Sequence, residues 1–439
     1  MTTTRRAARI ISVGGGKGGV GKSLIAGNLG VAMAQEGARV VIVDTDLGAA
    51  NQHTLFGIDR PGPTIQGLFE HTISTLEQAI IPSGVPNLDL VPGIAAAVGA
   101  ADISLAQKAQ LIGEICALPA EVIIVDVGAG VSFNVLDLFD VAELRLVVMT
   151  PQLTSLQNAY AFIKGAVFRE LKRAAQTSAQ VALIEESPEA SQQMLRMKDL
   201  LERLEKADPA LGDRVRTALS CFGARLLGNQ VFDVKERTTV FAISRMLNDF
   251  LGVEAPVLGC LRSTRAVHDS VRLRRPYLLE ETSEESASVL RETAKVLLRE
   301  KVDDLRAARE RVREAGAAPV TQDVPPSPEI PEMLASYQRS QLRVRVKCEA
   351  TLVFAGGAVP VQVRDVSEGG ALLGIDRPPW VDARAVLVVS MLADRPSLPC
   401  LVRHASSEEK RAGVQFVGEK ELVQRVVAEL KQRYRSEEP

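Results

Sequence analysis

The chain has 439 residues, a formal net charge of −2 at pH 7, 46% hydrophobic residues and 24% charged residues. This length allows two or three domains, and the composition is typical of globular proteins. The near-zero charge gives no indication of nucleic acid or a membrane as partner. No apolar run approaches the roughly 18 residues of a membrane span. The five cysteines are scattered, so we expect a cytoplasmic protein with reduced thiols rather than disulfides or a zinc site.

A glycine-rich segment lies near the start of the chain. Residues 16–23 read G-x-x-x-x-G-K-S, between a strand-like run at 10–13 and a helical pattern at 24–29. In this context successive backbone N–H groups surround phosphate oxygens, and the lysine supplies a charge for the outer phosphates. We therefore predict a phosphate-binding loop with a magnesium ligand at Ser23. The residues expected to bind the nucleotide are Gly16, Gly18, Gly19, Val20, Gly21, Lys22 and Ser23.

Uninterrupted apolar runs at 39–44, 121–126 and 145–150 are typical of buried parallel strands. They predict a doubly wound α/β domain over residues 1–300. Asp44, Asp46 and Asp126 follow at the carboxyl ends of two of these strands, where such sheets bind ligands. Carboxylates there can hold magnesium-bound water or orient an attacking water.

Four further segments complete the domain organisation. Residues 174–222 are predicted to form a helical insertion, with Met194, Met197, Leu200, Leu201 and Leu204 at helical spacing for core packing. A second apolar stripe, from Leu290 to Leu305, is expected to dock on its own domain. A helix that binds a membrane surface favours a cationic polar face, whereas acidic residues accompany this stripe. Residues 301–335 combine a charged helix with a proline-rich linker, and residues 336–439 form a second domain of strands with a closing helix.

The motif "KGGVGKS", with Lys17 ahead of Lys22, resembles the deviant Walker A motif of the MinD/ParA ATPases. "DTDLGAANQHTLFG", "DVGAG" and "TPQLTSLQNAYAFIK" make the chain most similar to the FlhG (FleN) branch, over residues 9–173 and again over 226–299. The resemblance implies that two subunits enclose ATP and that Lys17 reaches the partner's nucleotide. It also implies a role for Asp46 in positioning the hydrolytic water, for Asp44 and Asp126 around magnesium, and for Asn229 in recognising adenine.

Two positions depart from this family pattern. Gln152 and Asn158 stand where the family has acids in its "TPE…DAY" stretch. Neutral amides keep hydrogen-bonding capacity but lose the attraction to a lysine. We therefore expect altered dimer geometry or turnover.

The second domain resembles the PilZ domain. "RSQLR" at 339–343, "DVSEGG" at 365–370 and "RAGVQFVG" at 411–418 carry this resemblance, which implies a small antiparallel β-barrel that binds cyclic di-GMP. Guanidinium groups pair with phosphate and stack on purines, as this ligand requires. The residues expected to bind it are Arg339, Arg343, Asp365, Ser367 and Gly370.

Together these features predict an ATP-dependent dimerising switch that positions or regulates a machine such as the flagellum, with control by cyclic di-GMP. The expected partners are a second copy of the chain, a protein of a motility or polar-localisation system and, peripherally, a membrane. A ParA-type partition ATPase that contacts DNA through the basic stretch from Arg262 to Arg275 is an alternative. A nucleotide-binding adaptor with little turnover is another, and an iron–sulfur carrier is disfavoured by the cysteine spacing.

Overall fold

The computed structural model divides the chain into two compact units, Met1–Pro331 and Glu332–Pro439. We describe each unit by itself. The described residues are 7–47, 49–93, 103–185, 197–280, 285–315, 344–355, 357–367, 370–376, 383–390, 392, 394, 396–406, 410–417 and 420–435.

The first unit is built on an eight-stranded sheet with the order β3-β4-β2-β5-β1-β6-β7-β8. All its pairings are parallel except the one between β3 and β4 at the edge. The doubly wound α/β prediction is confirmed, and the three apolar runs are β2, β5 and β6. The strands are β1 (Arg9–Gly14), β2 (Val40–Thr45), β3 (Ile81–Val85), β4 (Leu88–Val91), β5 (Val122–Val127), β6 (Leu144–Met149), β7 (Ala224–Gly228) and β8 (Val257–Cys260).

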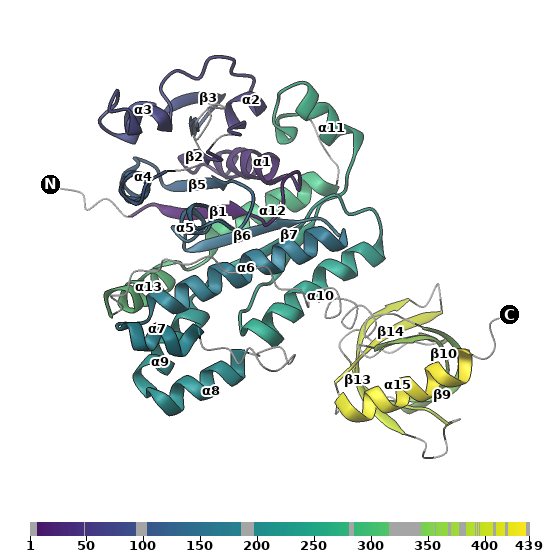
Figure 1. The fold of residues 1–439 in the computed structure, drawn as a ribbon. Helices are drawn as coiled ribbons and strands as arrows, with labels where there is room; N and C mark the ends of the chain where they lie inside the picture. Colours follow the sequence, from purple (N-terminus) through teal and green to yellow (C-terminus); the bar gives the residue numbers. More distant parts are fainter. Residues whose placement is uncertain are drawn as a thin grey trace. The chain divides into compact units, whose positions relative to one another are not determined.

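Helices cover both faces of this sheet (Figure 1). On one face lie α1 (Lys22–Gln35) and α12 (Glu285–Arg299), and on the other lie α5 (Phe133–Phe139), α6 (Leu153–Arg173) and α10 (Val234–Leu251). Outside residues 174–222, this part of the chain also contains α2 (Gln52–Leu55), α3 (Ile65–Phe69), η1 (Leu76–Ala79), α4 (Leu105–Ala117), α11 (Arg265–Arg272) and η2 (Tyr277–Leu279). Among the described helices, none is both long and apolar enough to cross a lipid bilayer.

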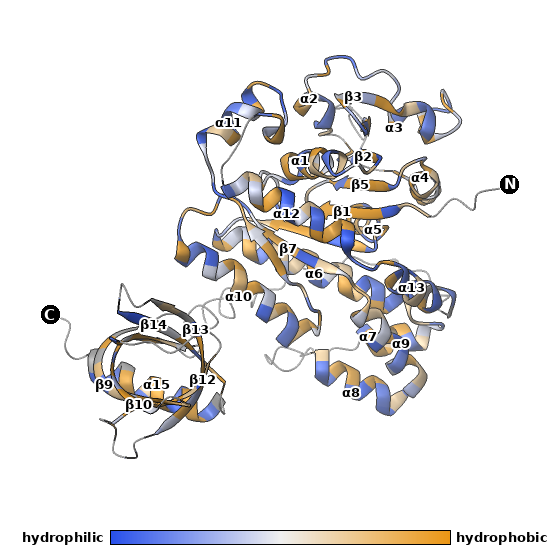
Figure 2. Cartoon of the chain, turned by 180° about the vertical axis from the view of Figure 1, so that it is seen from behind, coloured by the Kyte–Doolittle hydropathy of each residue, from blue (hydrophilic) through white to orange (hydrophobic). Residues whose placement is uncertain are grey.

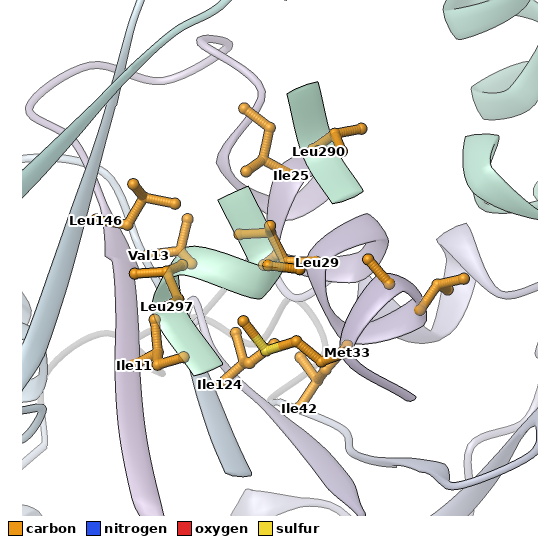
Figure 3. Packing of buried hydrophobic residues seen from close by; sticks show 14 of the residues in the cluster. Ile11, Val13, Ile25, Leu29, Met33, Ile42, Ile124, Leu146, Leu290 and Leu297 are labelled. Carbon is orange, nitrogen blue, oxygen red and sulfur yellow. The ribbon is translucent and has the colours of Figure 1, made fainter. Parts of the chain in front are cut away.

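The core beneath α1 joins strands and helices that are far apart in the sequence. Figure 3 shows Ile11, Val13, Ile124 and Leu146 of the strands around Ile25, Leu29 and Met33 of α1 and Leu290 and Leu297 of α12. The central strands are mostly hydrophobic, whereas the outer helices carry hydrophilic and hydrophobic faces (Figure 2). The apolar stripe of α12 is therefore buried on its own unit, as predicted.

The stretch 174–222 contains three helices, α7 (Ser178–Glu185), α8 (Met197–Ala207) and α9 (Pro209–Ser220). Met197, Leu200 and Leu204 of the predicted stripe are buried, and Met194 lies outside the described residues. The charged stretch after α12 forms α13 (Asp303–Ala315), which packs against α9. This helix is thus part of the first unit.

The second unit is a closed antiparallel barrel with the strand order β10-β11-β14-β13-β12-β9, which confirms the predicted small β-barrel. The helix α15 (Lys420–Arg435) buries Val423, Val426, Val427 and Leu430, an apolar stripe at helical spacing, in the barrel core. The strands are β9 (Val344–Phe354), β10 (Gly357–Ser367), β11 (Gly370–Gly374), β12 (Arg384–Val388), β13 (Ser397–Ser406) and β14 (Arg411–Phe416).

A cluster of buried charges ties α13 to the first unit. Arg145 of β6 is 0% exposed, and its guanidinium donates to Glu170 Oε1 of α6 at 2.8 Å. Arg309 of α13, 5% exposed, donates to the same oxygen at 2.8 Å and to the backbone oxygens of Asp140 and Ala142. Because a buried ion is tolerated only when it is paired and hydrogen-bonded, these contacts fix the position of α13.

We predict that Arg309→Met destabilises the first unit by about 3 kcal/mol, because two buried backbone carbonyls lose a donor. Glu170 keeps Arg145 and Arg173 as partners, so the cluster is weakened rather than broken. Urea unfolding followed by helical circular dichroism measures the change. Tryptophan fluorescence reports the second unit separately, because Trp380 is the chain's one tryptophan.

The matched control is Arg311→Met at an exposed position of the same helix. It is expected to change the free energy of unfolding by less than about 0.5 kcal/mol. If both variants unfold at the wild-type urea concentration, the buried contacts of Arg309 do not stabilise the unit.

Candidate functional site

The predicted phosphate loop lies between β1 and α1, at the carboxyl edge of the sheet. Gly19 and Gly21 adopt φ angles of 78° and 95°, which favour glycine. Gly21 is the N-cap of α1, and no side chain caps the helix there. The first backbone N–H groups of α1 are therefore left for an anion, as the motif predicts. Gly18 and Gly19 are exposed, Val20 is buried, and Gly16, Gly21 and Ser23 are partly buried.

The loop is packed closely from two sides. A Cβ on Gly16 would lie 2.0 Å from the backbone oxygen of Asn158 in α6, and a Cβ on Gly21 would lie 2.3 Å from Nδ2 of Asn229. Asn229 also donates from Nδ2 to the backbone oxygen of Val20 at 2.8 Å. Neither glycine can be replaced without moving this packing.

The two lysines of the loop occupy different environments. Lys22 is 7% exposed, and its Nζ donates to the backbone oxygen of Lys17 at 3.5 Å. Burial lowers the pKa of Lys22, while the carboxylates of Asp126 and Asp46 act in the opposite direction. Lys17 lies at the surface, where its Nζ donates to Thr154 Oγ1 of α6 at 2.9 Å. One lysine is thus enclosed beside acids, and the other is held by a neutral hydroxyl.

Two buried carboxylates lie side by side on neighbouring strands, and one of them, Asp126, is close to Lys22. Asp44 and Asp126 are register partners across the β2 and β5 pair and are at most 1% exposed. Burial raises the pKa of both, and the charge of Asp126 raises that of Asp44 further. Asp44 accepts backbone N–H groups of Asp46, Asn51 and Gln52 at 3.2, 2.8 and 2.9 Å. Asp44 therefore has both oxygens engaged.

These residues fit a magnesium ion. Oδ1 of Asp126 is buried and has no hydrogen-bond partner of acceptable geometry among the described residues. The side chains of Gln52 and Ser23 and the charge of Lys22 favour the ionised form of Asp126. Because magnesium prefers carboxylate, hydroxyl and water oxygens, Asp126 and Ser23 supply suitable donors. The backbone bonds of Asp44 leave it to act through water.

Sequence reasoning missed two residues of this site. Gln52, 0% exposed, donates from Nε2 to the backbone oxygen of Ser23 at 2.9 Å and to Oδ2 of Asp126 at 2.8 Å. Thr154 holds Lys17 near the altered positions Gln152 and Asn158. Asn158 uses its amide within α6, donating to the backbone oxygen of Thr154 at 2.8 Å. The sequence "DTDLGAANQH" puts Gln52 close to the acids along the chain, but the direction of the Gln52 side chain depends on the fold.

Asn229 supports the loop rather than an open base pocket. A small cavity of about 10 Å³ adjoins it, lined in part by Leu24, Asn28 and Tyr277. This volume holds about one water molecule. Adenine recognition by Asn229 stays a prediction.

The predicted dinucleotide motif lies partly on the described barrel. The register between β10 and its neighbours shifts between Val363 and Asp365, and this bulge leaves Asp365 partly buried while Val366 is buried. Ser367 is buried, and its Oγ donates to the backbone oxygen of Gly370 at 3.4 Å. A Cβ on Gly370 would lie 2.1 Å from the backbone oxygen of Val414, so β14 packs closely here. Arg339 and Arg343 lie outside the described residues.

The basic stretch around α11 is largely paired with acids. Arg265 and Arg272 both contact Asp269, Arg274 contacts Asp59 at 2.5 Å, and Arg275 contacts Glu280 at 3.2 Å. These acids reduce the positive charge that a nucleic acid would meet. DNA binding by this stretch stays an untested alternative.

The sequence of this chain is similar to those of known proteins. Residues 11–276 match the family model of the CobQ/CobB/MinD/ParA nucleotide binding domain, and residues 337–430 match that of the PilZ domain. Antiactivator FleN of Pseudomonas aeruginosa is 34% identical over 159 residues, which are 36% of this chain and 55% of that protein. Flagellum site-determining protein YlxH of Helicobacter pylori is 32% identical over 158 residues, 36% of this chain and 53% of that protein. The chain thus spans about half the length of the curated relatives it matches.

Among solved structures, the septum site-determining protein MinD complexed with Mg-ADP from Pyrococcus horikoshii OT3 aligns with a TM-score of 0.47 and 18% identity. The alignment covers 69% of this chain and 98% of that chain. The family assignment itself rests on the sequence model, which matches more than half of the chain. The chain belongs to the CobQ/CobB/MinD/ParA nucleotide-binding domain family, and it carries a PilZ domain at residues 337–430.

Proposed function

We propose that this chain is an ATP-dependent dimerising switch, an ATPase that positions or regulates a motility machine under the control of cyclic di-GMP. The observation that carries the proposal is the enclosed Lys22, which lies beneath the glycine loop beside the carboxylates of Asp126 and Asp46. A buried ammonium, an uncapped helix N-terminus and paired acids are suited to a triphosphate with a divalent cation.

Each residue has a distinct role in this proposal. Lys22 and the first N–H groups of α1 bind the phosphates of their own subunit, and Asp46 orients the attacking water. Ser23 would bind magnesium directly, and Asp126 and Asp44 would hold it through water. The ion, when bound, neutralises charge on the phosphate oxygens. We propose slow hydrolysis that a partner stimulates, because Gln152 and Asn158 supply no negative charge near Lys17.

A second copy of the chain is the proposed partner at this edge. Lys17 is held at the surface by one neutral hydroxyl, so it is able to leave for the phosphates of another subunit. Apolar side chains are exposed after the ends of β5, β6 and β7, as expected of an interface. They are Val131 (36% exposed), Leu153 (48%), Phe232 (63%) and Val234 (78%).

Cyclic di-GMP control and the motility role rest on the PilZ match and on the names of the relatives. FleN is named as an antiactivator, and YlxH is named as a flagellum site-determining protein. We propose that this chain acts in the cytoplasm on a protein of a motility or polar-localisation system, with peripheral membrane contact at its site of action. Dinucleotide binding would alter the contact of the PilZ domain with the ATPase unit or a partner.

Separate substitutions of Lys22 and Asp46 should distinguish nucleotide binding from turnover. Lys22→Ala is expected to weaken ATP binding about 10- to 100-fold, because phosphate loses a charge-assisted contact. Asp46→Ala is expected to keep ATP binding, lose hydrolysis and accumulate an ATP-bound dimer. Calorimetry and light scattering after size exclusion measure both outcomes, and a monomeric Asp46→Ala protein in saturating ATP would contradict the dimer model.

Lys17→Ala tests whether the second lysine acts across subunits. In the Asp46→Ala background, it is expected to abolish the ATP-dependent dimer while the affinity of the monomer for ATP changes little. Thr154→Val is the control, because it removes the resting contact of Lys17 but keeps the ammonium. A persistent dimer with Lys17→Ala would show that this lysine does not serve the other subunit.

Removing both arginines of the PilZ motif should abolish dinucleotide binding. Arg339→Ala with Arg343→Ala is expected to lose cyclic di-GMP binding in calorimetry while ATP affinity stays unchanged, because guanidinium groups bind phosphate and purine together. Arg384→Ala, at an exposed position of β12, is the matched control. Undiminished dinucleotide affinity in the double variant would refute the ligand assignment.

A further inference from the structure

Gln52 connects three parts of the nucleotide site. Its side-chain Nε2 donates to the backbone oxygen of Ser23, in the first turn of α1, and to Oδ2 of Asp126, at the end of β5. Its backbone N–H donates to Oδ2 of Asp44, at the end of β2. The residue is 0% exposed, so water does not compete for these bonds.

The hydrogen bonds define the orientation of the Gln52 amide. A glutamine NH₂ group has two donors, and the two acceptors on Ser23 and Asp126 use both of them. Oε1 consequently points away from the acids, and it is buried with no hydrogen-bond partner among the described residues. A Cβ on Gly27 would lie 3.2 Å from this oxygen, so the glycine provides its space. The protein thus tolerates one unsatisfied acceptor while holding both donors in place.

We infer that Gln52 is a positioning residue for the magnesium–nucleotide site. Its bond to Oδ2 fixes the rotation of the Asp126 carboxylate and leaves Oδ1, the buried oxygen without a partner, as the oxygen available to the ion's hydration shell. Its bond to Ser23 fixes the helix turn that carries the predicted magnesium ligand. This inference rests on the proposed function and adds a residue outside the loop and the acids.

An apolar residue of similar volume would fill the same space without these effects. Leucine has no donor, so Oδ2 of Asp126 would lose its amide partner, and only Ser23 and the charge of Lys22 would orient the carboxylate. Groups that orient metal ligands typically contribute about 10- to 100-fold to metal affinity or activity. The substitution should therefore change how strongly magnesium increases nucleotide affinity, and it should leave the affinity measured without magnesium unchanged.

The test measures ADP binding to the full chain by calorimetry, in excess magnesium and in EDTA. For the wild type, affinity is expected to be higher with magnesium. Gln52→Leu is expected to reduce the ratio of the two affinities about tenfold, while the affinity in EDTA stays near the wild-type value. Gln66→Leu is the matched control, because the amide of Gln66 in α3 donates to Glu70 in an exposed contact within the same turn of the chain. It should leave the ratio unchanged.

Gln52→Met provides a second variant should the leucine variant fail to fold, since methionine is unbranched and also lacks the donors. If the folded variants keep the wild-type ratio of the affinities in magnesium and in EDTA, the inference is overturned. An equal loss of affinity in both buffers would also overturn it, because such a loss indicates a structural role alone. Absence of ADP binding by the wild type in both buffers would refute the proposed function instead. The two failures are therefore distinguishable.

Discussion

The site depends on a steric constraint: backbone and amide atoms pack so closely against the phosphate loop at Gly16 and Gly21 that neither position has space for a side chain. α6 closes on the loop at Gly16, and Asn229 closes on it at Gly21. The glycines therefore serve two purposes, because the same residues that let N–H groups face an anion also let the loop be packed from behind. A loop held in this way keeps its N–H groups oriented before the ligand arrives, and preorganised donors lower the cost of binding.

The support behind the loop extends through a single helix. The first turns of α6 contact Lys17 and Gly16, and its last turns carry Glu170 into the buried charge cluster. At 21 residues, the helix is about 30 Å long. Arg309 of α13 enters the same cluster, so the last described helix of the first unit is anchored to the element that backs the loop. Continuous packed structure thus joins α13 to the phosphate site.

Local patterns predicted the parts of this molecule that depend on local chemistry. The loop motif, the apolar strands β2 and β5 and the barrel strands follow from spacing and alternation. Arg145, Arg309 and Gln52 did not follow, because each is polar and becomes buried only through partners distant in the sequence. The helix at 303–315 has the composition of a solvated linker, and it is held on the first unit by Arg309 together with the apolar Leu305 and Val312. Tertiary pairing of charge has no periodic signature in a sequence.

The electrostatics of the site make it dependent on its ligands. The pKa values of the neighbouring carboxylates Asp44 and Asp126 are raised, and that of Lys22 beside Asp126 is lowered, so burial opposes the charged form of all three side chains. A magnesium–triphosphate ligand would place a cation beside the acids and anionic oxygens beside the lysine, and it would therefore stabilise each ionised form. Lys17 differs, because it lies at the surface and its ammonium donates to a neutral hydroxyl. In the proposed dimer, the enclosed charges would thus respond to the nucleotide of their own subunit, and the surface lysine would serve that of the other.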